Sequence, residues 1–393
     1  MRKGSIERKR VNVQYTEYEL GELLPFEQPT AYIVKSTDYS DAYATPVLTA
    51  GKSFILGKTN ETDGIFDQLP VIIFDDFTTA TQFVNFRFKV KSSAMKILHI
   101  NTNLVIPKYI FYRLQIIQFD HSTHKRYWIQ SYSKIKVLIP PLDEQSRIVA
   151  RIEELFSELD KTVDTLKTTK EQLEVYRQAV MKDAFQEKES IIRLGDAIEK
   201  PRYGTSKKCD YLCTANSTAV LRIPNIDTKN GRVDSSDLKY AEFNEKELEQ
   251  LSLKNGDILI IRSNGSISLV GSSAIIRKCD TDKTYAGYLM RLRILNKEKL
   301  LPKYLLYYLS SPDARRYIES VAKSTSGVNN INSQEISKLC VPLSSIETQE
   351  KTVAEIEMKL SVYHEIEKSV DTVLVQADAM RQSILKQAFE GKI

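Results

Sequence analysis

The chain has 393 residues, of which 42% are hydrophobic and 27% are charged; this excludes a small disulfide scaffold and predicts a folded, globular protein. Its longest apolar runs, such as Val71–Phe74 and Ile258–Ile261, are far shorter than the roughly 20 residues that a membrane span needs. No apolar stretch follows the basic residues at the N-terminus, so we expect no secretory signal and a cytoplasmic location.

The net charge of +5 is unevenly distributed along the chain. Residues 1–140 carry a net charge of +5 and residues 191–340 one of +7, whereas residues 141–190 and 341–393 carry −4 and −3. Basic globular segments are typical of proteins that bind a polyanion such as nucleic acid. The charge pattern therefore predicts two basic, polyanion-binding parts, each followed by an acidic part.

In chain order, the first basic part has strand candidates at 69–77 and 83–90. The first acidic part has no Gly or Pro between Leu142 and Gln186, which predicts one long helix. The second basic part has strand candidates at 253–261 and 272–277 and a short helix at 302–309. The second acidic part predicts another long helix.

Both acidic parts place apolar residues at steps of three, four or seven, which is typical of a coiled-coil seam. The first seam contains Ile148, Ile152, Leu155, Leu159, Leu166, Leu173, Tyr176 and Val180. The second contains Val353, Ile356, Leu360, Tyr363, Val370, Val373, Ala377, Met380 and Ile384. A helix of about 40 residues extends about 60 Å and outruns one compact domain, so we expect each seam to cover the other.

The chain is an internal duplication. Matching residues of the acidic parts lie 204 positions apart: Gln145 and Gln349, Ile152 and Ile356, Arg177 and Arg381, Phe185 and Phe389. We therefore predict an α+β fold with two basic α+β domains, at 1–139 and 189–341. Each is followed by a long helix, at 140–188 and 342–393, and the two helices pair as an antiparallel coiled coil with pseudo-twofold symmetry.

Metal binding is weakly indicated. Cys209 and Cys213 are spaced C-x3-C, and Cys279 and Cys340 could complete a zinc site, but a second close pair is missing. We expect reduced, half-buried thiols and no metal. His121 and His124 lie three apart without a third ligand, which favours a polar loop.

The motifs of an autonomous enzyme are incomplete. Pro140-Pro141 lacks the flanking Asn or Asp and the aromatic residue that an adenine methyltransferase needs, and neither Lys52-Ser53 nor Lys58-Thr59 completes a phosphate-binding loop. No Glu-x-Lys triplet follows Asp75-Asp76 on an adjacent strand, as a nuclease requires. An autonomous DNA-modifying enzyme and a coiled-coil adaptor without DNA binding remain the alternatives. The adaptor explains the seams but not the basic parts.

Three segments in this order resemble the specificity subunit of a type I restriction-modification enzyme, over the whole chain. They are Ile139-Pro140-Pro141-Leu142-Asp143-Glu144-Gln145 entering the first helix, Leu253 to Ile261, and Ser324 to Asn332. The second copy departs from the first of these with Val341-Pro342-Leu343 and Glu347-Thr348-Gln349.

The resemblance implies that 1–139 and 189–341 are target recognition domains, each reading one half of a bipartite duplex DNA target. It also implies that the helices set the spacing and dock two methyltransferase subunits, which restriction subunits join. The chain itself would be non-catalytic and without a cofactor. S-adenosylmethionine, ATP and Mg would belong to the partner subunits.

Candidate DNA-binding residues are cations, hydroxyls and amides in turns of the basic parts, where side chains can meet phosphates and base edges. In the second domain, three segments supply Arg202, Tyr203, Thr205, Ser206, Lys207 and Lys208; Arg262, Ser263, Asn264 and Ser266; and Thr325, Ser326, Asn329 and Asn330. The first domain supplies Lys52, Lys58, Asn60, Thr62, Thr78, Thr79 and Thr81. Solvated turns are the alternative interpretation. We expect Phe77, Phe83, Phe86 and Phe88 to lie in the core.

Overall fold

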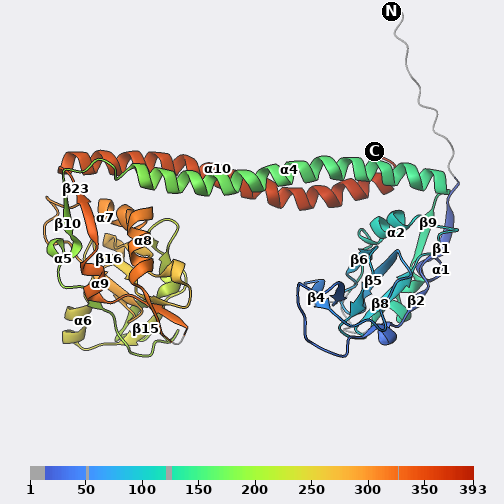
Figure 1. The fold of residues 1–393 in the computed structure, drawn as a ribbon, viewed down its shortest axis with the longest axis horizontal. Helices are drawn as coiled ribbons and strands as arrows, with labels where there is room; N and C mark the ends of the chain where they lie inside the picture. The colour runs from blue at the N-terminus through green and yellow to red at the C-terminus, as the bar shows by residue number, and fades with distance from the viewer. Residues whose placement is uncertain (1–13, 50–52, 121–125, 326) are drawn as a thin grey trace, which may run out of the picture. The chain divides into compact units, whose positions relative to one another are not determined.

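The computed structural model describes residues 14–49, 53–120, 126–325 and 327–393, and it divides the chain into two compact units (Figure 1). Unit 1 consists of residues 1–166 and 372–393, and unit 2 of residues 167–371. Each unit contains one globular α+β part and a portion of both long helices, α4 (Leu142–Asp183) and α10 (Ile346–Phe389). The predicted α+β class and the two long helices are confirmed. The four predicted domain boundaries stay a prediction, because the units divide within the helices.

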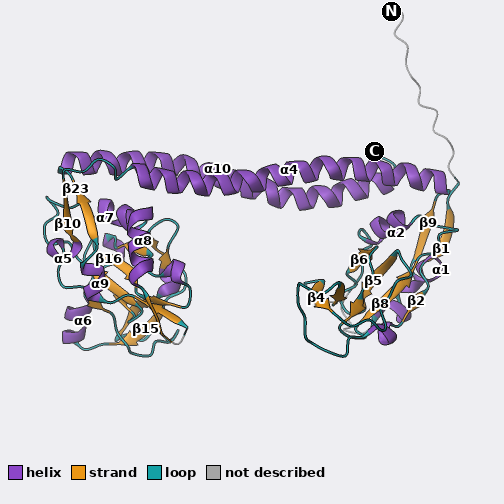
Figure 2. Cartoon of the chain, viewed as in Figure 1, coloured by secondary structure: helices purple, strands orange, loops and turns teal. Residues whose placement is uncertain are grey.

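The globular part of unit 1 is built on two sheets, drawn in orange in Figure 2. One is antiparallel, in the order β2 (Phe26–Glu27), β8 (Met95–His99), β5 (Val71–Asp75), β6 (Thr81–Val84). The other has the order β4 (Ile55–Thr59), β3 (Thr45–Leu48), β7 (Lys89–Val90). All five residues of β5 are buried, as a run of apolar residues predicts. The candidate 83–90 is divided between β6 and β7.

Besides a two-stranded ribbon, the described residues of the globular part of unit 2 form three sheets. The largest has the order β11 (Arg202–Tyr203), β20 (Leu289–Leu292), β16 (Ile258–Ile261), β18 (Ser273–Ile275), β14 (Arg232–Val233), β13 (Ile226–Asp227). The second has the order β15 (Lys239–Glu242), β12 (Ser217–Leu221), β19 (Thr284–Tyr285). The third has the order β17 (Ser263–Asn264), β22 (Val328–Asn330), β21 (Lys323–Thr325). Both strand candidates contain a strand, β16 and β18.

The duplication extends to the strand order of the two units. The order β2-β8-β5-β6 in unit 1 corresponds to β11-β20-β16-β18 in unit 2, and β4-β3-β7 corresponds to β15-β12-β19. Each unit also has a two-stranded ribbon next to its long helix, formed by β1 (Thr16–Glu19) with β9 (Lys136–Ile139) and by β10 (Ser190–Arg193) with β23 (Cys340–Leu343). The connection from β5 to β6 is therefore the counterpart of the connection from β16 to β18.

Corresponding short helices join each sheet to the long helices. In unit 1, α2 (Pro107–Leu114) packs in one core with residues of α4 and α10, including Ile152 and Leu385. In unit 2, α7 (Pro302–Leu309), which begins and ends where the sequence predicts, does so with Met181 and Ile356. The other helices are α1 (Leu20–Leu23), α3 (Tyr127–Gln130), α5 (Leu194–Ala197), α6 (Glu245–Leu251), α8 (Pro312–Val321), α9 (Ser333–Ser337), and the 3-10 turns Pro29–Tyr32, Tyr132–Lys134, Ile223–Asn225, Ile267–Leu269 and Lys278–Asp280.

The long helices run antiparallel within each unit. In unit 2, Lys170 Nζ lies 2.7 Å from Asp371 Oδ1, and Glu174, four residues further along α4, accepts from the hydroxyl of Tyr363, eight residues earlier in α10. In unit 1, Arg381 pairs with Asp160. The helix α10 ends where Gly391 takes a φ of +68°, which favours glycine. The prediction of a buried seam was wrong for three residues, because Tyr176, Val373 and Met380 are exposed.

Among the residues that the structure describes, no helix is both long enough and apolar enough to span a membrane.

All four cysteines are free: Cys209 is half-buried, whereas Cys213, Cys279 and Cys340 are exposed. The expectation of half-buried thiols was therefore wrong for three of them.

Candidate nucleic-acid interface

A cavity of about 590 Å³ in unit 2 brings together two of the three segments predicted for the second domain. It is lined by Thr205, Ser206 and Lys207 from the first segment and by Arg262 and Ser263 from the second. Further lining comes from Cys209, Arg222, Ile223, Pro224, Lys239, Ala286, Gly287 and Tyr288. Four of these side chains are cationic, and hydroxyl groups lie beside them, which is the composition that contacts phosphates and base edges.

Arg262 is held in place by the residues around it. It directly follows the buried strand β16, and its backbone N–H donates to Tyr288 O at 2.9 Å. Its guanidinium donates to Gly287 O at 3.1 Å and lies 4.4 Å from the ring centroid of Tyr203, a cation–π contact. A guanidinium held by stacking and one hydrogen bond keeps further donors for a planar acceptor such as a guanine edge.

The third predicted segment lies beside the second. Strand β17 pairs antiparallel with β22, so that Ser263 is opposite Asn330 and Asn264 is opposite Asn329. Asn329 Nδ2 donates to Gly265 O at 2.9 Å, and Asn264 Oδ1 accepts from Ser266 N at 2.8 Å. The amides of Asn264 and Asn329 are therefore partly used to hold the turn that follows Arg262.

The first predicted segment is tied to its surroundings more firmly than a solvated turn would be. Lys207 Nζ lies 2.7 Å from a carboxylate oxygen of Glu247, and this hydrogen bond lowers the pKa of Glu247. Arg202 donates to Gln250 at 3.2 Å, and Tyr203 accepts from Ser333 N at 2.8 Å. Ser206 and Lys208 are exposed.

Position 204 requires a glycine because the backbone of Tyr285 and Ala286 lies too close for a side chain, and not because the segment needs flexibility. A Cβ at this position would lie 2.2 Å from Tyr285 O and 2.4 Å from Ala286 O. Gly204 therefore lets the chain pass directly over the backbone of β19.

In unit 1 the candidate residues fall into two groups along the chain. Lys58 lies in β4, and Asn60 and Thr62 follow that strand. Thr78, Thr79 and Thr81 lie at the connection from β5 to β6, the counterpart of the connection that carries Arg262.

Hydroxyl groups at the connection from β5 to β6 are engaged in hydrogen bonds within unit 1. Thr78 Oγ1 donates to Asp75 Oδ2 at 2.6 Å, and Thr79 has a φ of +59°. Thr81 Oγ1 accepts from Gln115 Nε2 at 2.6 Å. The hydroxyl groups of Thr78 and Thr81 are used in these bonds, so they are poorer candidates for base contacts than Arg262 is.

Two predicted residues, Lys52 and Ser326, lie outside the described residues, and Thr325 is described only as part of the backbone of β21. Phe88 is buried, and Phe83 and Phe86 are partly buried against the core, as predicted. Phe77 was predicted wrongly, because 47% of its surface is exposed.

Sequence reasoning missed Arg222, Lys239 and Tyr288 in the cavity wall. Arg222 follows the apolar end of β12 as Arg262 follows β16, and this signal could have found it. Arg222 Nη2 lies 2.9 Å from Asp237 Oδ2, and Lys239 Nζ lies 4.6 Å from the ring centroid of Tyr211. Tyr288 is 62% exposed and offers a stacking surface.

The acidic pair Asp75-Asp76 has a structural use. Asp75 accepts from Phe77 N at 2.9 Å and from Thr78, while buried Asp76 accepts from Trp128 N at 2.9 Å and lies 3.3 Å from Lys96 Nζ. In the described part of the chain, no group of three or more His, Cys, Asp or Glu side chains is placed to hold a metal ion.

Two α+β units share the order of four strands in their main sheets, and each packs against both long helices. Together with the cation-lined cavity of the second unit, this duplication defines the class of tandem recognition proteins. Residues 12–175 match the family model described as the type I restriction modification DNA specificity domain. Over 360 residues the chain is 36% identical to the EcoR124I/EcoR124II specificity subunit of Escherichia coli, covering 85% of this chain and 84% of that one. Over 278 residues it is 29% identical to the EcoKI specificity subunit of Escherichia coli strain K12, covering 67% of this chain and 59% of that one.

Solved structures agree at the level of the fold. A chain from a study of complex assembly and conformational transition in the type I R-M system aligns with a TM-score of 0.69 and 17% identity, covering 98% of this chain and all of that one. The HsdS subunit from Thermoanaerobacter tengcongensis aligns with a TM-score of 0.53 and 16% identity, covering 98% and 99%. The chain belongs to the family of type I restriction enzyme specificity subunits. The predicted family is confirmed, and the comparisons favour it over the two alternatives, an autonomous enzyme and an adaptor.

Proposed function

We propose that this chain reads a bipartite duplex DNA target, with one half-site for each globular part, and that it is itself non-catalytic. The observation that carries the proposal is the cavity of unit 2. There Arg262 follows a buried strand, stacks on Tyr203 and shares the wall with Lys207, Arg222 and Lys239. A rigidly held arginine beside hydroxyl groups suits direct reading of a base edge, with the other cations on nearby phosphates.

The counterpart in unit 1 supports one reading element in each unit. The connection from β5 to β6 occupies the place of the connection from β16 to β18, and Asp75 fixes its shape. The equivalent place therefore carries a different set of side chains in each unit. Two different half-sites are expected from one duplicated fold.

The long helices have exposed apolar side chains suited to partner subunits. On α10, Met358, Val362 and Ile366 lie four residues apart and are between 41% and 62% exposed, so they share one face of the helix. On α4, Val175 and Tyr176 are also exposed. Exposed apolar stripes of this kind mark protein interaction sites. We assign these exposed apolar residues to contacts with two methyltransferase subunits, which restriction subunits join.

The chemistry would then reside in the partners. S-adenosylmethionine is the methyl donor expected on the methyltransferase subunits, and ATP and Mg are expected on the restriction subunits. The chain would need no cofactor of its own and would work in the cytoplasm.

The experiment is a genome-wide map of methylated adenines in strains with and without this protein, combined with duplex binding by the purified chain. We expect one bipartite motif to disappear in the strain without it. We also expect affinity for duplex DNA to fall steeply with salt, because phosphate contacts release counterions. An unchanged methylation map would contradict the reading function. A duplex affinity that does not depend on salt would favour the adaptor.

A further inference from the structure

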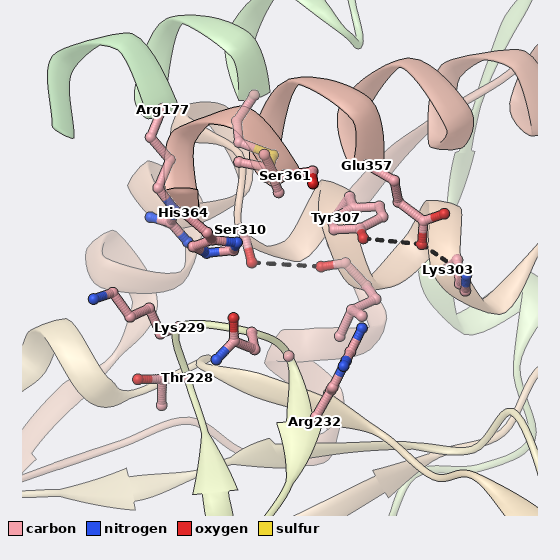
Figure 3. Close-up of a pocket in the computed structure, with 15 residues that line it drawn as sticks. Arg177, Thr228, Lys229, Arg232, Lys303, Tyr307, Ser310, Glu357, Ser361 and His364 are labelled. Atoms are coloured by element: carbon pink, nitrogen blue, oxygen red, sulfur yellow. Dashed lines mark hydrogen bonds and ion pairs between the residues drawn. The ribbon is translucent and has the colours of Figure 1, made fainter. Parts of the chain in front are cut away.

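A second cavity of unit 2, of about 470 Å³, lies between the globular part and the long helices (Figure 3). Arg177 enters it from α4 and His364 from α10, while Lys229 comes from the turn between β13 and β14 and Arg232 from the start of β14. Lys303 of α7 closes one side. This cavity shares no lining residue with the candidate nucleic-acid interface.

Cationic side chains outnumber carboxylates in the wall. Arg177, Lys229, Arg232 and Lys303 line the cavity, and Glu357 is the one acidic residue among the described lining residues. Lys303 Nζ lies 2.6 Å from Glu357 Oε1, and Lys229 Nζ lies 2.6 Å from Glu367 Oε1, at the edge. Arg232 makes no ion pair with any residue that the structure describes.

Two nitrogen atoms of the wall lack partners. Arg177 Nε and His364 Nε2 are both shielded from solvent, and neither has a hydrogen-bond partner among the described residues. Nη1 of Arg177 is 3.5 Å from Glu174, an ion pair longer than those of Lys303 with Glu357 and Lys229 with Glu367. A polar nitrogen that is buried without a partner is unfavourable, and a bound acceptor would remove that cost.

The duplication provides an internal comparison. The corresponding cavity of unit 1 is lined by Tyr112, Glu153, Ser157 and Arg381, the counterparts of Tyr307, Glu357, Ser361 and Arg177. The position of His364 is occupied there by Asp160, which pairs with Arg381. The arginine of unit 1 is therefore neutralised by a carboxylate. In unit 2 an imidazole takes the place of that carboxylate.

We propose that the cavity of unit 2 binds a phosphate group, held by Arg177 and Arg232 with His364 and Lys229 beside them. A phosphate has several acceptor oxygen atoms and a charge that guanidinium groups bind in bidentate fashion. The group comes either from a free phosphate compound or from a phosphodiester of DNA. The proposal does not depend on the reading of half-sites by the other cavity.

The test measures binding of inorganic phosphate to the full chain by calorimetry, with three variants. His364→Asp installs the carboxylate of unit 1, so it is expected to pair with Arg177 and to weaken phosphate binding at least about tenfold. Arg232→Gln removes the unpaired guanidinium and is expected to weaken binding by about tenfold. Arg87→Gln removes an equal charge from an exposed pair with Asp67 in unit 1, and we expect less than about a twofold change. Melting curves check that each variant folds.

Duplex DNA distinguishes the two sources of phosphate. If the group belongs to DNA, Arg232→Gln reduces the salt dependence of duplex binding by about one counterion, and Arg87→Gln does not. If the group is free, the duplex measurements of wild type and variants coincide while phosphate binding differs. The proposal is overturned if His364→Asp and Arg232→Gln both match wild type in phosphate binding and in the duplex measurements. It is also overturned if wild type shows neither saturable phosphate binding nor a change in the duplex measurements on Arg232→Gln.

Discussion

Gln145 and Gln349 make the same three hydrogen bonds at corresponding positions of the two long helices. Gln145 Oε1 accepts from Ile106 N at 2.8 Å, and Nε2 donates to Leu104 O at 3.0 Å and Pro140 O at 2.8 Å. Gln349 Oε1 accepts from Leu301 N at 2.9 Å, and Nε2 donates to Lys299 O at 2.8 Å and Ser344 O at 2.9 Å. Both glutamines are completely buried. Each fastens the first turn of a long helix to the start of the short helix that packs beneath it.

Replacement of Gln349 by leucine should loosen this junction. The change leaves Leu301 N and two carbonyl groups without their partner, which should cost about 1–3 kcal/mol. Hydrogen exchange should therefore become faster in α7 and in the first turns of α10. The matched control is Gln172→Leu, the same substitution at an exposed position of α4 in unit 2. Equal protection in both variants would contradict a fastening role for Gln349.

Glu61 should make the stability of unit 1 depend on pH. Its carboxylate accepts from Ser36 N at 2.9 Å and from Lys35 N at 2.8 Å, and it lies 3.1 Å from the buried ammonium of Lys89. The hydrogen bond from Ser36 contributes most to lowering the pKa of Glu61 below its ordinary 4.5, and the bond from Lys89 adds to it. The folded state therefore favours the ionised carboxylate.

A lowered pKa gives stability that is fully present above pH 4.5 and is lost as the pH falls through the folded value. Glu61→Gln should destabilise unit 1 by about 1–3 kcal/mol at neutral pH, because the buried ammonium of Lys89 loses its counter-charge and keeps its hydrogen bond to Asp63 O. In this variant the free energy of unfolding should also decrease less as the pH falls. Glu158→Gln, at an exposed position of α4, serves as the control in melts between pH 3 and 7. Parallel pH profiles for the wild type and Glu61→Gln would refute this role.

Arg262 should determine one base of a half-site. Arg262→Ala should weaken specific binding by about 1–3 kcal/mol and relax a single position, whereas Arg262→Lys should keep the charge and still relax that position. Arg316→Ala removes an exposed arginine of α8 and should change neither. Binding to a library of duplexes measures both effects. Uniform weakening over all sequences would mean that Arg262 contacts a phosphate.

The long helices should set the spacing between half-sites. Four helix-forming residues inserted between Thr168 and Thr169, with four more between Asp371 and Thr372, add about one turn, or roughly 6 Å, to each helix. DNA rises about 3.4 Å per base pair, so the spacer of the methylated motif should lengthen by one or two base pairs. Both half-sites should keep their sequence. Methylation at the original spacing with full efficiency would show that the helices do not set it.

The sequence predicts most of the architecture for two reasons. Apolar periodicity is visible within each helix, and the 204-residue repeat is visible when the two halves of the chain are compared. Long-range packing explains what it misses. Tyr176 matches the heptad steps but is exposed, whereas its neighbour Arg177 lines the cavity. Phe77 is exposed because Asp75 folds the chain into a turn directly after β5. The position of Arg222 after an apolar strand marks it as a candidate, but only the sheet arrangement brings it into the same cavity wall as Arg262.

The two globular parts should read their half-sites independently, and the exchange of one part tests this independence. Residues 191–338 are replaced by the corresponding segment of another specificity subunit, and methylated adenines are mapped across the genome of a strain that carries the chimaera and its methyltransferase. One half of the bipartite motif should change while the other half and the spacer remain as they are in the wild type. A motif in which both halves change, or in which neither does, would contradict the assignment of one half-site to each part.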